Sequence, residues 1–351
     1  MLIFDKLKNL FNSLPTVRFN DIKSLVSRCK DFIKKTKIKL NDLSKTNFDL
    51  GIYHLKRGNL DDAILRFRLV RRFGSRYKDL DYLLGRCYLE KLKYNKARVL
   101  FENYTKENNS KFSEEARYCL SITNNELDNI KSVPISIIDH KLGQQFDSYM
   151  KESKASKNKD SKNIVYEKIK EVLESNEKVF NYNMLDLSCR VGLVAYFLRK
   201  DQLLHFLLGV GINKNMVEYC KKLSIDSHKV YNTVIKEDVK AFLISKAQTD
   251  SKFDIILGTD LITYSTDLKL FFMELKAYMN KNGIMAFNFS ATEHCDAGYV
   301  FDLKLENFIY NKDYITRTVK SCGWQVIKHE EIKSKKGEYP QVIMIIKLKK
   351  L

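Results

Sequence analysis

The sequence has few of the residues that mark disordered, disulfide-bonded or metal-stapled chains. Proline occurs only 3 times in 351 residues, which excludes a proline-rich low-complexity protein. The 7 cysteines are scattered and odd in number, and no two of them form a CxxC pair. We therefore expect neither a disulfide framework nor a metal site. This cysteine usage fits a reducing compartment, so we expect a cytoplasmic protein.

Long apolar runs are also missing. No stretch approaches the roughly 18 apolar residues of a membrane-spanning helix. The opening MLIFDKLKNLFNSLP carries an acid at Asp5, so we do not expect a secretory signal. Its apolar residues recur at helical spacing, at Ile3, Leu7, Leu10 and Leu14, which predicts an amphipathic helix. We expect this helix to cap the neighbouring domain, and membrane-surface binding is the alternative.

Acidic residues are outnumbered by basic ones. Lys and Arg total 62 against 43 Asp and Glu, a net charge of +19. Such an excess is typical of proteins that bind RNA or anionic lipid. Lysine far outnumbers arginine, however, and Asn, Ile and Tyr are abundant, as in proteins from A+T-rich genomes. We interpret the charge as surface solvation, with nucleic-acid binding as the alternative. The 44% of hydrophobic residues and the length allow two domains with separate cores.

The N-terminal half contains an internal repeat. FDLGIYHLKRGNLDDAILRFRLV aligns with YLLGRCYLEKLKYNKARVLFENY. Four pairs of identical residues lie 34 positions apart, namely Leu50 and Leu84, Gly51 and Gly85, Ala63 and Ala97, and Phe67 and Phe101. This period and pattern resemble the tetratricopeptide repeat, with a small residue where two helices cross and an aromatic ring between helices. Helices predicted at Asp21–Lys35 and Ser113–Ile122 would complete the stack as degenerate or capping elements.

A tetratricopeptide-like solenoid implies an interaction function. Its groove would bind a protein or peptide partner. The second helix of the first copy is rich in arginine, and Arg68 and Arg72 lie one turn apart, where they would clamp a carboxylate. The other arginines of this cluster are Arg66, Arg71 and Arg76. A solvated charged face is the alternative interpretation, and we favour it.

The C-terminal half is organised around NMLDLSCRVG at Asn183–Gly192. An apolar strand, a small-residue turn and the helical GLVAYFLRK follow one another, which is how an α/β sheet binds the polar end of a ligand. The stretch resembles the first motif of class I S-adenosylmethionine-dependent methyltransferases, an apolar strand followed by D-L-G-C-G-T-G. The matching residues are Asp186, Leu187, Cys189 and Gly192. Ser188 and Arg190 stand where that family has two glycines, and Val191 replaces the threonine.

Further segments alternate between strand and helix, as in a parallel sheet. The predicted strands are Met184–Leu187, Leu204–Ile212, Lys229–Val234, Phe253–Leu257, Ile284–Phe289, one from Trp324, and Val342–Lys347. The predicted helices are Tyr166–Leu173, Leu193–Arg199, Lys214–Lys222, Asp238–Lys246, Leu268–Met279 and Asp313–Ser321. The turn KSKKGEY makes the last two strands antiparallel, and seven strands with an antiparallel edge match the class I methyltransferase sheet.

The expected fold class is therefore α followed by α/β. We expect a helical tetratricopeptide-like solenoid at residues 1–125 and a Rossmann-like methyltransferase domain at 166–351. Residues 126–165 form the predicted linker, which contains the lysine-rich insertion SKASKNKDSKN. Within it, IDHKLGQQFDSYMKE resembles a segment that precedes the catalytic domain of tetratricopeptide-containing methyltransferases, through Phe146, Asp147 and Tyr149.

The resemblance implies S-adenosylmethionine as the cofactor. Its methionine end would meet the loop of Asp186, Ser188, Arg190 and Gly192. Arg190 stands where the backbone needs a left-handed conformation, which costs a side chain roughly 1–2 kcal/mol. Its guanidinium either fills the pocket or pairs with the methionine carboxylate.

The nucleoside end of the cofactor would meet the next two strands. In LLGVGINKNM, Gly211 occupies the position of the ribose-binding acid, so a contact of about 1.5–3 kcal/mol would be absent. Asn213 would either accept one ribose bond or cap the following helix. The resemblance assigns Asp238 to the adenine amino group and Val239 to the ring. Thr259 follows the fourth strand, beside the cofactor.

The implied reaction is an in-line displacement at the sulfonium methyl group, driven largely by positioning. Where a base takes part, the candidates are Asp260, Glu293 and His294. The N/D-P-P-Y signature of adenine methylation is missing, and NFIYN at Asn307–Asn311 replaces an Arg-Tyr-Ala-His-like segment of the tetratricopeptide-containing relatives. An inactive scaffold that binds partners is the alternative function, favoured by Ser188, Arg190 and Gly211. A dehydrogenase is a distant third, because it needs the same glycines and acid.

Overall fold

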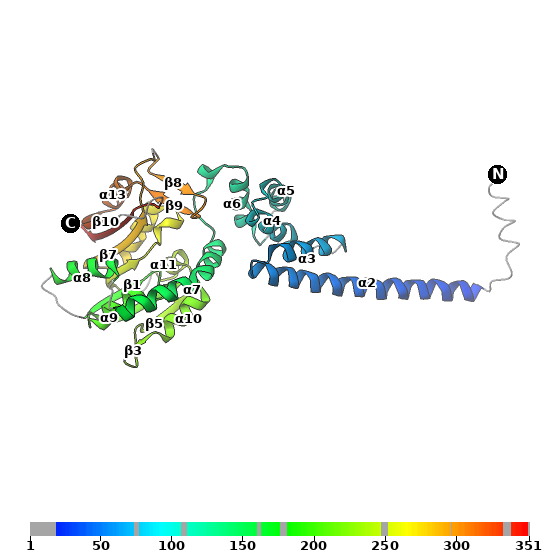
Figure 1. Ribbon diagram of the computed structural model, residues 1–351, viewed down its shortest axis with the longest axis horizontal. Coiled ribbons are helices and arrows are strands. Elements are labelled where there is room, and N and C mark those ends of the chain that lie inside the picture. Colours follow the sequence, from blue (N-terminus) through cyan, green and yellow to red (C-terminus); the bar gives the residue numbers. More distant parts are fainter. Residues whose placement is uncertain are drawn as a thin grey trace. The chain divides into compact units, whose positions relative to one another are not determined.

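The computed structural model describes residues 19–73, 77–106, 111–159, 163–175, 181–246, 252–295, 297–332 and 338–349. The helix predicted at the start of the chain, Arg76 and most of the KSKKGEY turn lie outside these ranges. The chain divides into two compact units, Met1–Thr123 and Asn124–Leu351. Figure 1 shows that the first is helical and the second is built around a sheet.

The first unit is a series of helices that pack in sequence. They are α2 (Phe19–Lys56), α3 (Leu60–Arg72), α4 (Leu80–Glu90), α5 (Tyr94–Thr105) and α6 (Ser113–Thr123). The helix predicted at Asp21–Lys35 is the first half of α2, which runs on into the first repeat. Neighbours pair as α2 with α3, α4 with α5, and α5 with α6.

The two copies of the sequence repeat share one packing contact. A Cβ atom on Gly51 would lie 2.5 Å from the Phe67 ring, and one on Gly85 would lie 2.7 Å from the Phe101 ring. Both phenylalanines are fully buried. Only glycine allows the helices to approach this closely, so the sequence period of the first unit is also a packing period.

The second unit contains the predicted seven-stranded sheet, in the order β10-β11-β7-β6-β1-β2-β5. Its strands are β1 (Tyr182–Asp186), β2 (Leu204–Gly211), β5 (Thr233–Lys236), β6 (Phe253–Gly258), β7 (Met279–Ser290), β10 (Trp324–Ile332) and β11 (Gln341–Leu348). The five strands from β5 to β7 are parallel. The last strand, β11, is antiparallel to both β7 and β10, so it lies one strand inside the edge.

Helices flank this sheet (Figure 1). They are α7 (Ile135–Lys159), α8 (Ile164–Glu174), α9 (Leu193–Lys200), α10 (Lys214–Lys222), α11 (Val239–Lys246), α12 (Leu268–Glu274) and α13 (Lys312–Ser321), with short 3-10 turns η1 (Leu127–Asn129), η2 (Ile262–Tyr264) and η3 (Leu275–Tyr278). The helix predicted at Leu268–Met279 is therefore α12 followed by η3. The central strands are buried on both faces, which is why they read as nearly continuous apolar runs.

One strand prediction needs correction, and one hairpin was not predicted. The strand predicted at Lys229–Val234 begins only at Thr233. A small hairpin of β3 (Ser224–Ile225) and β4 (His228–Lys229) precedes it, and of the predicted range only Lys229 belongs to this hairpin. Val230 and Tyr231 follow outside any strand. These two residues are apolar because they are buried in the core, not because they pair in a sheet. The structure also contains a hairpin of β8 (Tyr299–Asp302) and β9 (Asn307–Tyr310), which the sequence pattern did not predict.

The structure also departs from the predicted linker. Residues 126–165 lie in the second compact unit, and most of them form the 25-residue helix α7. Ile137 and Leu142 are buried on this helix, and Phe146 packs against Tyr219 of α10 with ring centroids 6.4 Å apart. The lysine-rich stretch continues the helix as far as Lys159. Where its burial is described, the buried residue of this stretch is Ser153, which is polar, and this explains why the stretch reads as polar.

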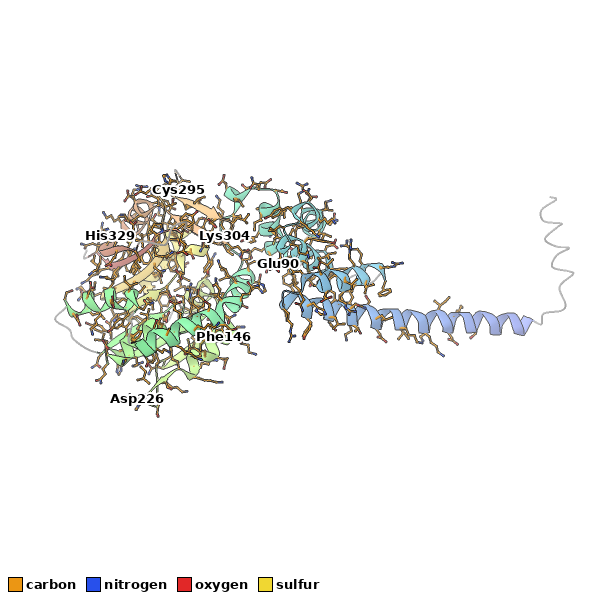
Figure 2. The ribbon with its side chains drawn as sticks, in the orientation of Figure 1. Glu90, Phe146, Asp226, Cys295, Lys304 and His329 are labelled. Atoms are coloured by element: carbon orange, nitrogen blue, oxygen red, sulfur yellow. The ribbon has the colours of Figure 1, made fainter. Side chains whose placement is uncertain are left out.

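Figure 2 marks Phe146 on α7 and Lys304 on the loop between β8 and β9.

Across the described ranges, every helix is too short or too polar to cross a lipid bilayer.

Candidate active site

A cavity of about 810 Å³ opens at the carboxyl ends of β1, β6 and β7. This edge is where parallel sheets bind ligands, and the volume lies within the roughly 300–1,000 Å³ of small-molecule sites. The walls come from α7, the loops after β1 and β6, the ends of β7 and β11, and the β8–β9 loop. Polar side chains that line it include Lys141, Gln145, Tyr149, Ser188, Arg190, Thr259, Asp260, Asn288, Ser290 and Gln341.

Asp186, the last residue of β1, organises the loop beneath the cavity. One carboxylate oxygen accepts the N–H of Ser188 at 3.1 Å, and the other accepts the hydroxyl of Tyr231 at 2.7 Å. Asp186 is only 2% exposed. Burial raises its pKa to about 6, although both hydrogen bonds and the charge of Arg190 oppose the shift. The carboxylate is thus committed to holding the loop.

The loop keeps the backbone of a glycine-rich turn although two glycines are replaced. Arg190 has φ +40° and Gly192 has φ +65°. A Cβ on Gly192 would lie 2.9 Å from Leu223 and from Tyr231, so glycine is required there. The Ser188 hydroxyl donates to the Thr259 carbonyl at 2.8 Å and lies 3.0 Å from the Thr259 hydroxyl. Serine therefore ties the loop after β1 to the loop after β6.

Arg190 reaches from its loop across to the end of β6. Its Nη1 atom lies 2.6 Å from Oδ2 of Asp260 and donates to the Tyr149 hydroxyl at 2.9 Å. The guanidinium lies 5.0 Å from the centre of the Tyr149 ring. Burial alone would lower the pKa of Arg190, but Asp260, Tyr149 and Tyr264 raise it above its ordinary value. Arg190 thus faces the cavity as a fixed cation.

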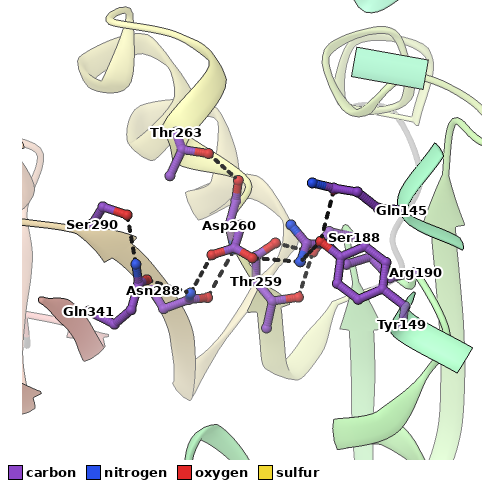
Figure 3. Close-up of polar contacts among 10 residues, drawn as sticks. All are labelled: Gln145, Tyr149, Ser188, Arg190, Thr259, Asp260, Thr263, Asn288, Ser290 and Gln341. Atoms are coloured by element: carbon purple, nitrogen blue, oxygen red, sulfur yellow. Dashed lines mark hydrogen bonds and ion pairs between the residues drawn. The ribbon is translucent and has the colours of Figure 1, made fainter. Parts of the chain in front are cut away.

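Asp260 is held by a network that Figure 3 shows. Its backbone has φ +50°, and its N–H donates to Oδ1 of Asn288 at 2.9 Å. Asn288 in return donates through Nδ2 to Oδ1 of Asp260. Beyond it, Gln341 donates to the Ser290 hydroxyl at 2.6 Å. Two left-handed non-glycine residues, Arg190 and Asp260, therefore meet in one ion pair, and such strain clusters at functional sites.

The residues predicted to hold the nucleoside lie elsewhere. Gly211, Asn213, Asp238 and Val239 are not among the described residues that line the cavity. A Cβ on Gly211 would lie 2.8 Å from the Cys189 sulfur, so an acid would not fit there without a shift.

The polar side chains of this nucleoside region have structural partners. Asn213 accepts the N–H groups of Asn215 and Met216 as the cap of α10, and donates to Oδ1 of Asp139 at 2.8 Å. Asp238 accepts the N–H of Ala241 at 3.1 Å, at the start of α11.

The three candidate bases separate. Asp260 lines the cavity, whereas Glu293 and His294 lie on an exposed loop after β7 and do not line it in the described part of the chain. Among the described residues, no cluster of three or more His, Cys, Asp or Glu side chains is placed to hold a metal ion.

Sequence reasoning missed Lys141 and Asn288. Lys141 lines the cavity from α7 and donates to the Leu305 carbonyl, and burial lowers its pKa. Asn288 is the one polar residue inside the apolar run of β7, GIMAFNF, and that interruption was the available signal. Nothing in the pattern around Lys141 distinguishes it from the surface lysines of α7.

Comparison with known proteins is consistent with this geometry. A family model described as a methyltransferase domain matches residues 178–336. No curated protein matches the chain in sequence.

Many solved structures resemble the chain, among them the following three. A SAM-dependent methyltransferase from Leishmania major is 16% identical, with 52% of this chain and 71% of that one covered and a TM-score of 0.43. The magnesium protoporphyrin IX methyltransferase of Synechocystis, with bound SAM, is 13% identical, with 69% and 99% covered and a TM-score of 0.40. A methyltransferase in complex with the Trm112 activator from Haloferax volcanii is 10% identical, with 59% of this chain and 97% of that one covered and a TM-score of 0.41.

The strand order and the family model agree over this part of the chain. Over residues 178–336, the chain is similar to a methyltransferase domain.

Proposed function

We propose that the second unit catalyses S-adenosylmethionine-dependent methyl transfer to a protein, peptide or small-molecule acceptor. The observation that carries the proposal is the cavity at the carboxyl ends of β1, β6 and β7, directly above the loop of the methyltransferase-like motif. The match of residues 178–336 to a methyltransferase domain supports it.

The cavity fits the methionine end of this cofactor better than its nucleoside end. The left-handed turn at Arg190 and Gly192 keeps the backbone form of a glycine loop, with Asp186, Ser188 and Thr259 around it. On the nucleoside side, Asp238 and Val239 remain partly exposed, while Gly211 and Asn213 have structural partners. When bound, S-adenosylmethionine supplies an activated methyl group.

The chain's own residues would position the acceptor. Asp260 presents a carboxylate fixed by Asn288 on one oxygen and Arg190 on the other, so it would orient a hydroxyl or amine donor of the acceptor. Helix α7 lines one wall through Gln145 and Tyr149 and would shield the reacting atoms from water on that side. Glu293 and His294 stay predicted alternatives for proton transfer.

Calorimetric titration tests the proposal directly. The full chain should bind S-adenosylhomocysteine more tightly than about 100 μM, which corresponds to roughly −5.5 kcal/mol. Gly192→Val should abolish this binding, because its side chain would collide with Leu223 and Tyr231. Gly58→Val is a matched control, since Gly58 also has positive φ but no atom within 4 Å of an added Cβ. Absence of heat at millimolar ligand would refute the proposal.

A partner-binding scaffold is the second candidate. It is favoured by the Arg190–Asp260 ion pair and by the structural roles of Gly211 and Asn213. A scaffold would give no heat with S-adenosylmethionine or S-adenosylhomocysteine and no methyl transfer.

The helical unit is proposed to present the acceptor or a partner through a tetratricopeptide-type groove, in the cytoplasm. The repeated Gly–Phe contact of Gly51 and Gly85 supports this reading. Gly51→Val should then lower kcat/KM for the acceptor and leave S-adenosylhomocysteine affinity unchanged. Equal losses of both would contradict a presenting role.

A further inference from the structure

Arg190 uses a single nitrogen for its polar contacts. Nη1 binds both Asp260 and Tyr149, at 2.6 Å and 2.9 Å. In the ranges that the structure describes, neither Nε nor Nη2 of this guanidinium has a hydrogen bond or an ion pair. The side chain is only 15% exposed and lines the cavity. Two N–H donors on one edge of a largely buried cation are thus left without a protein partner, which is costly unless a ligand satisfies them.

The shape of that edge selects the ligand. Nε and Nη2 carry two parallel N–H bonds, which match the two oxygens of a carboxylate. Nη1 is already occupied by Asp260, whose position Asn288 fixes, so the free edge is held in one orientation. Lys141 adds a second cation close enough to Arg190 that the two charges affect each other. An anion with two oxygens therefore finds complementary charge and geometry on this wall.

We infer that the cavity binds a ligand through a carboxylate seated on the Nε–Nη2 edge of Arg190. The carboxylate belongs either to the methionine end of the cofactor or to the acceptor. The first source rests on the proposed function, and the second does not require it. In both cases, the arginine that replaces a loop glycine is a ligand-binding residue and not a plug.

A pair of nucleosides separates the sources. S-adenosylhomocysteine carries the amino-acid carboxylate, and 5′-methylthioadenosine is a related thioether without it. The wild-type chain should prefer S-adenosylhomocysteine by about 10- to 100-fold, the range for hydrogen bonds to a charged group. Arg190→Gln should bring its affinity down to that of 5′-methylthioadenosine. Arg190→Lys, which keeps the charge without the fork, should retain part of the preference.

Succinate, followed by NMR titration, tests the acceptor source. A saturable shift in the wild type that is lost in Arg190→Gln, with unchanged S-adenosylhomocysteine affinity, assigns the carboxylate to the acceptor. Arg317→Gln is the matched control, because Arg317 is exposed on α13 and should behave as wild type in both titrations. Thermal melts verify folding, and Arg190→Gly, which relieves the left-handed strain, serves where Arg190→Gln is unstable.

The outcomes keep the two proposals apart. Equal S-adenosylhomocysteine and succinate binding in wild type and Arg190→Gln overturns the inference and leaves the methyltransferase proposal intact. A wild type that binds succinate through Arg190 but neither nucleoside overturns the methyltransferase proposal and leaves the inference intact. A wild type that binds none of the three overturns both.

Discussion

The two halves of the sheet's carboxyl edge use their polar residues differently. At β1, β6 and β7, the side chains of Ser188, Arg190 and Asp260 border an open cavity. At β2 and β5, Asn213 and Asp238 cap helices instead. Both halves match the same family pattern in sequence. A hydrogen-bonding atom already engaged inside the protein is not available to a ligand. A residue that matches a family motif therefore supports the fold but does not by that match contact a ligand.

The largest expected effect concerns Asp186 and pH. Its pKa is about 6 in the folded chain against an ordinary 3.8, because burial outweighs its hydrogen bonds. The folded state then holds the proton more tightly than the unfolded state. The contribution of Asp186 to the free energy of unfolding is therefore fully present below about pH 4 and is lost as the pH rises to about 6. The loss amounts to about 3 kcal/mol. Chemical denaturation at several pH values should show this slope in the wild type and not in Asp186→Asn.

Tyr231→Phe sharpens this test. The Tyr231 hydroxyl donates to ionised Asp186 and so lowers its pKa. Its removal should move the upper end of the pH window above 6. An identical pH slope in Asp186→Asn and the wild type would show that other groups cause it.

The second prediction attempts to convert the β2 half into a ligand-binding half. Gly211→Asp alone should cost about 1–3 kcal/mol, because its Cβ would meet the Cys189 sulfur at 2.8 Å. Combined with Cys189→Ala, the added Cβ still lies 3.2 Å from Cγ2 of Val217, so the new acid should cost less than Gly211→Asp does alone, with a smaller remaining cost from that contact. The double variant should bind S-adenosylhomocysteine at least about 10-fold more tightly than Cys189→Ala. Unchanged affinity in a folded double variant would mean that the ribose does not lie there.

The third prediction compares two helix caps. Asn213 and Asn311 each accept two backbone N–H groups, at the starts of α10 and α13. Only Asn213 also donates to Asp139 of α7, through two contacts. Asn311→Ala should therefore cost about 1 kcal/mol, and Asn213→Ala about 2 kcal/mol. Equal costs in urea denaturation would mean that the contact with α7 contributes nothing measurable.

The smallest expected effect is at the exposed loop after β7. Glu293→Gln and His294→Gln should change the methyl-transfer rate less than about 2-fold, because neither residue lines the cavity. Asp260→Asn is the comparison, and it should lower the rate at least about 10-fold by weakening the ion pair with Arg190. A larger loss from His294→Gln than from Asp260→Asn would move the chemistry to that loop.

Local patterns predicted most of the sheet, because apolar strands followed by Gly, Asn or Asp specify it one segment at a time. The antiparallel pairing of β10 and β11 also followed from a single turn, but their order in the sheet did not. The strand prediction was wrong at Val230 and Tyr231, because a residue buried in a loop and a residue buried in a strand are apolar alike.

The direction of Arg190 was not predictable from the sequence. Its partner Asp260 lies 70 positions away and Tyr149 lies 41 positions away, on the helix that was expected to be a linker. The same holds for the requirement for glycine at position 211, which depends on where the Cys189 side chain points. Contacts of this kind exist only after folding.

Ser188 has a consequence for how a molecule enters and leaves. Its hydroxyl joins the loop after β1 to Thr259 in the loop after β6, so the two loops beneath the cavity are held together. We therefore expect the entry and exit of a ligand to depend on the other walls of the cavity, formed by α7 and the β8–β9 loop. Ser188→Gly would remove this link and allow the two loops to move separately, so that they too would affect ligand entry.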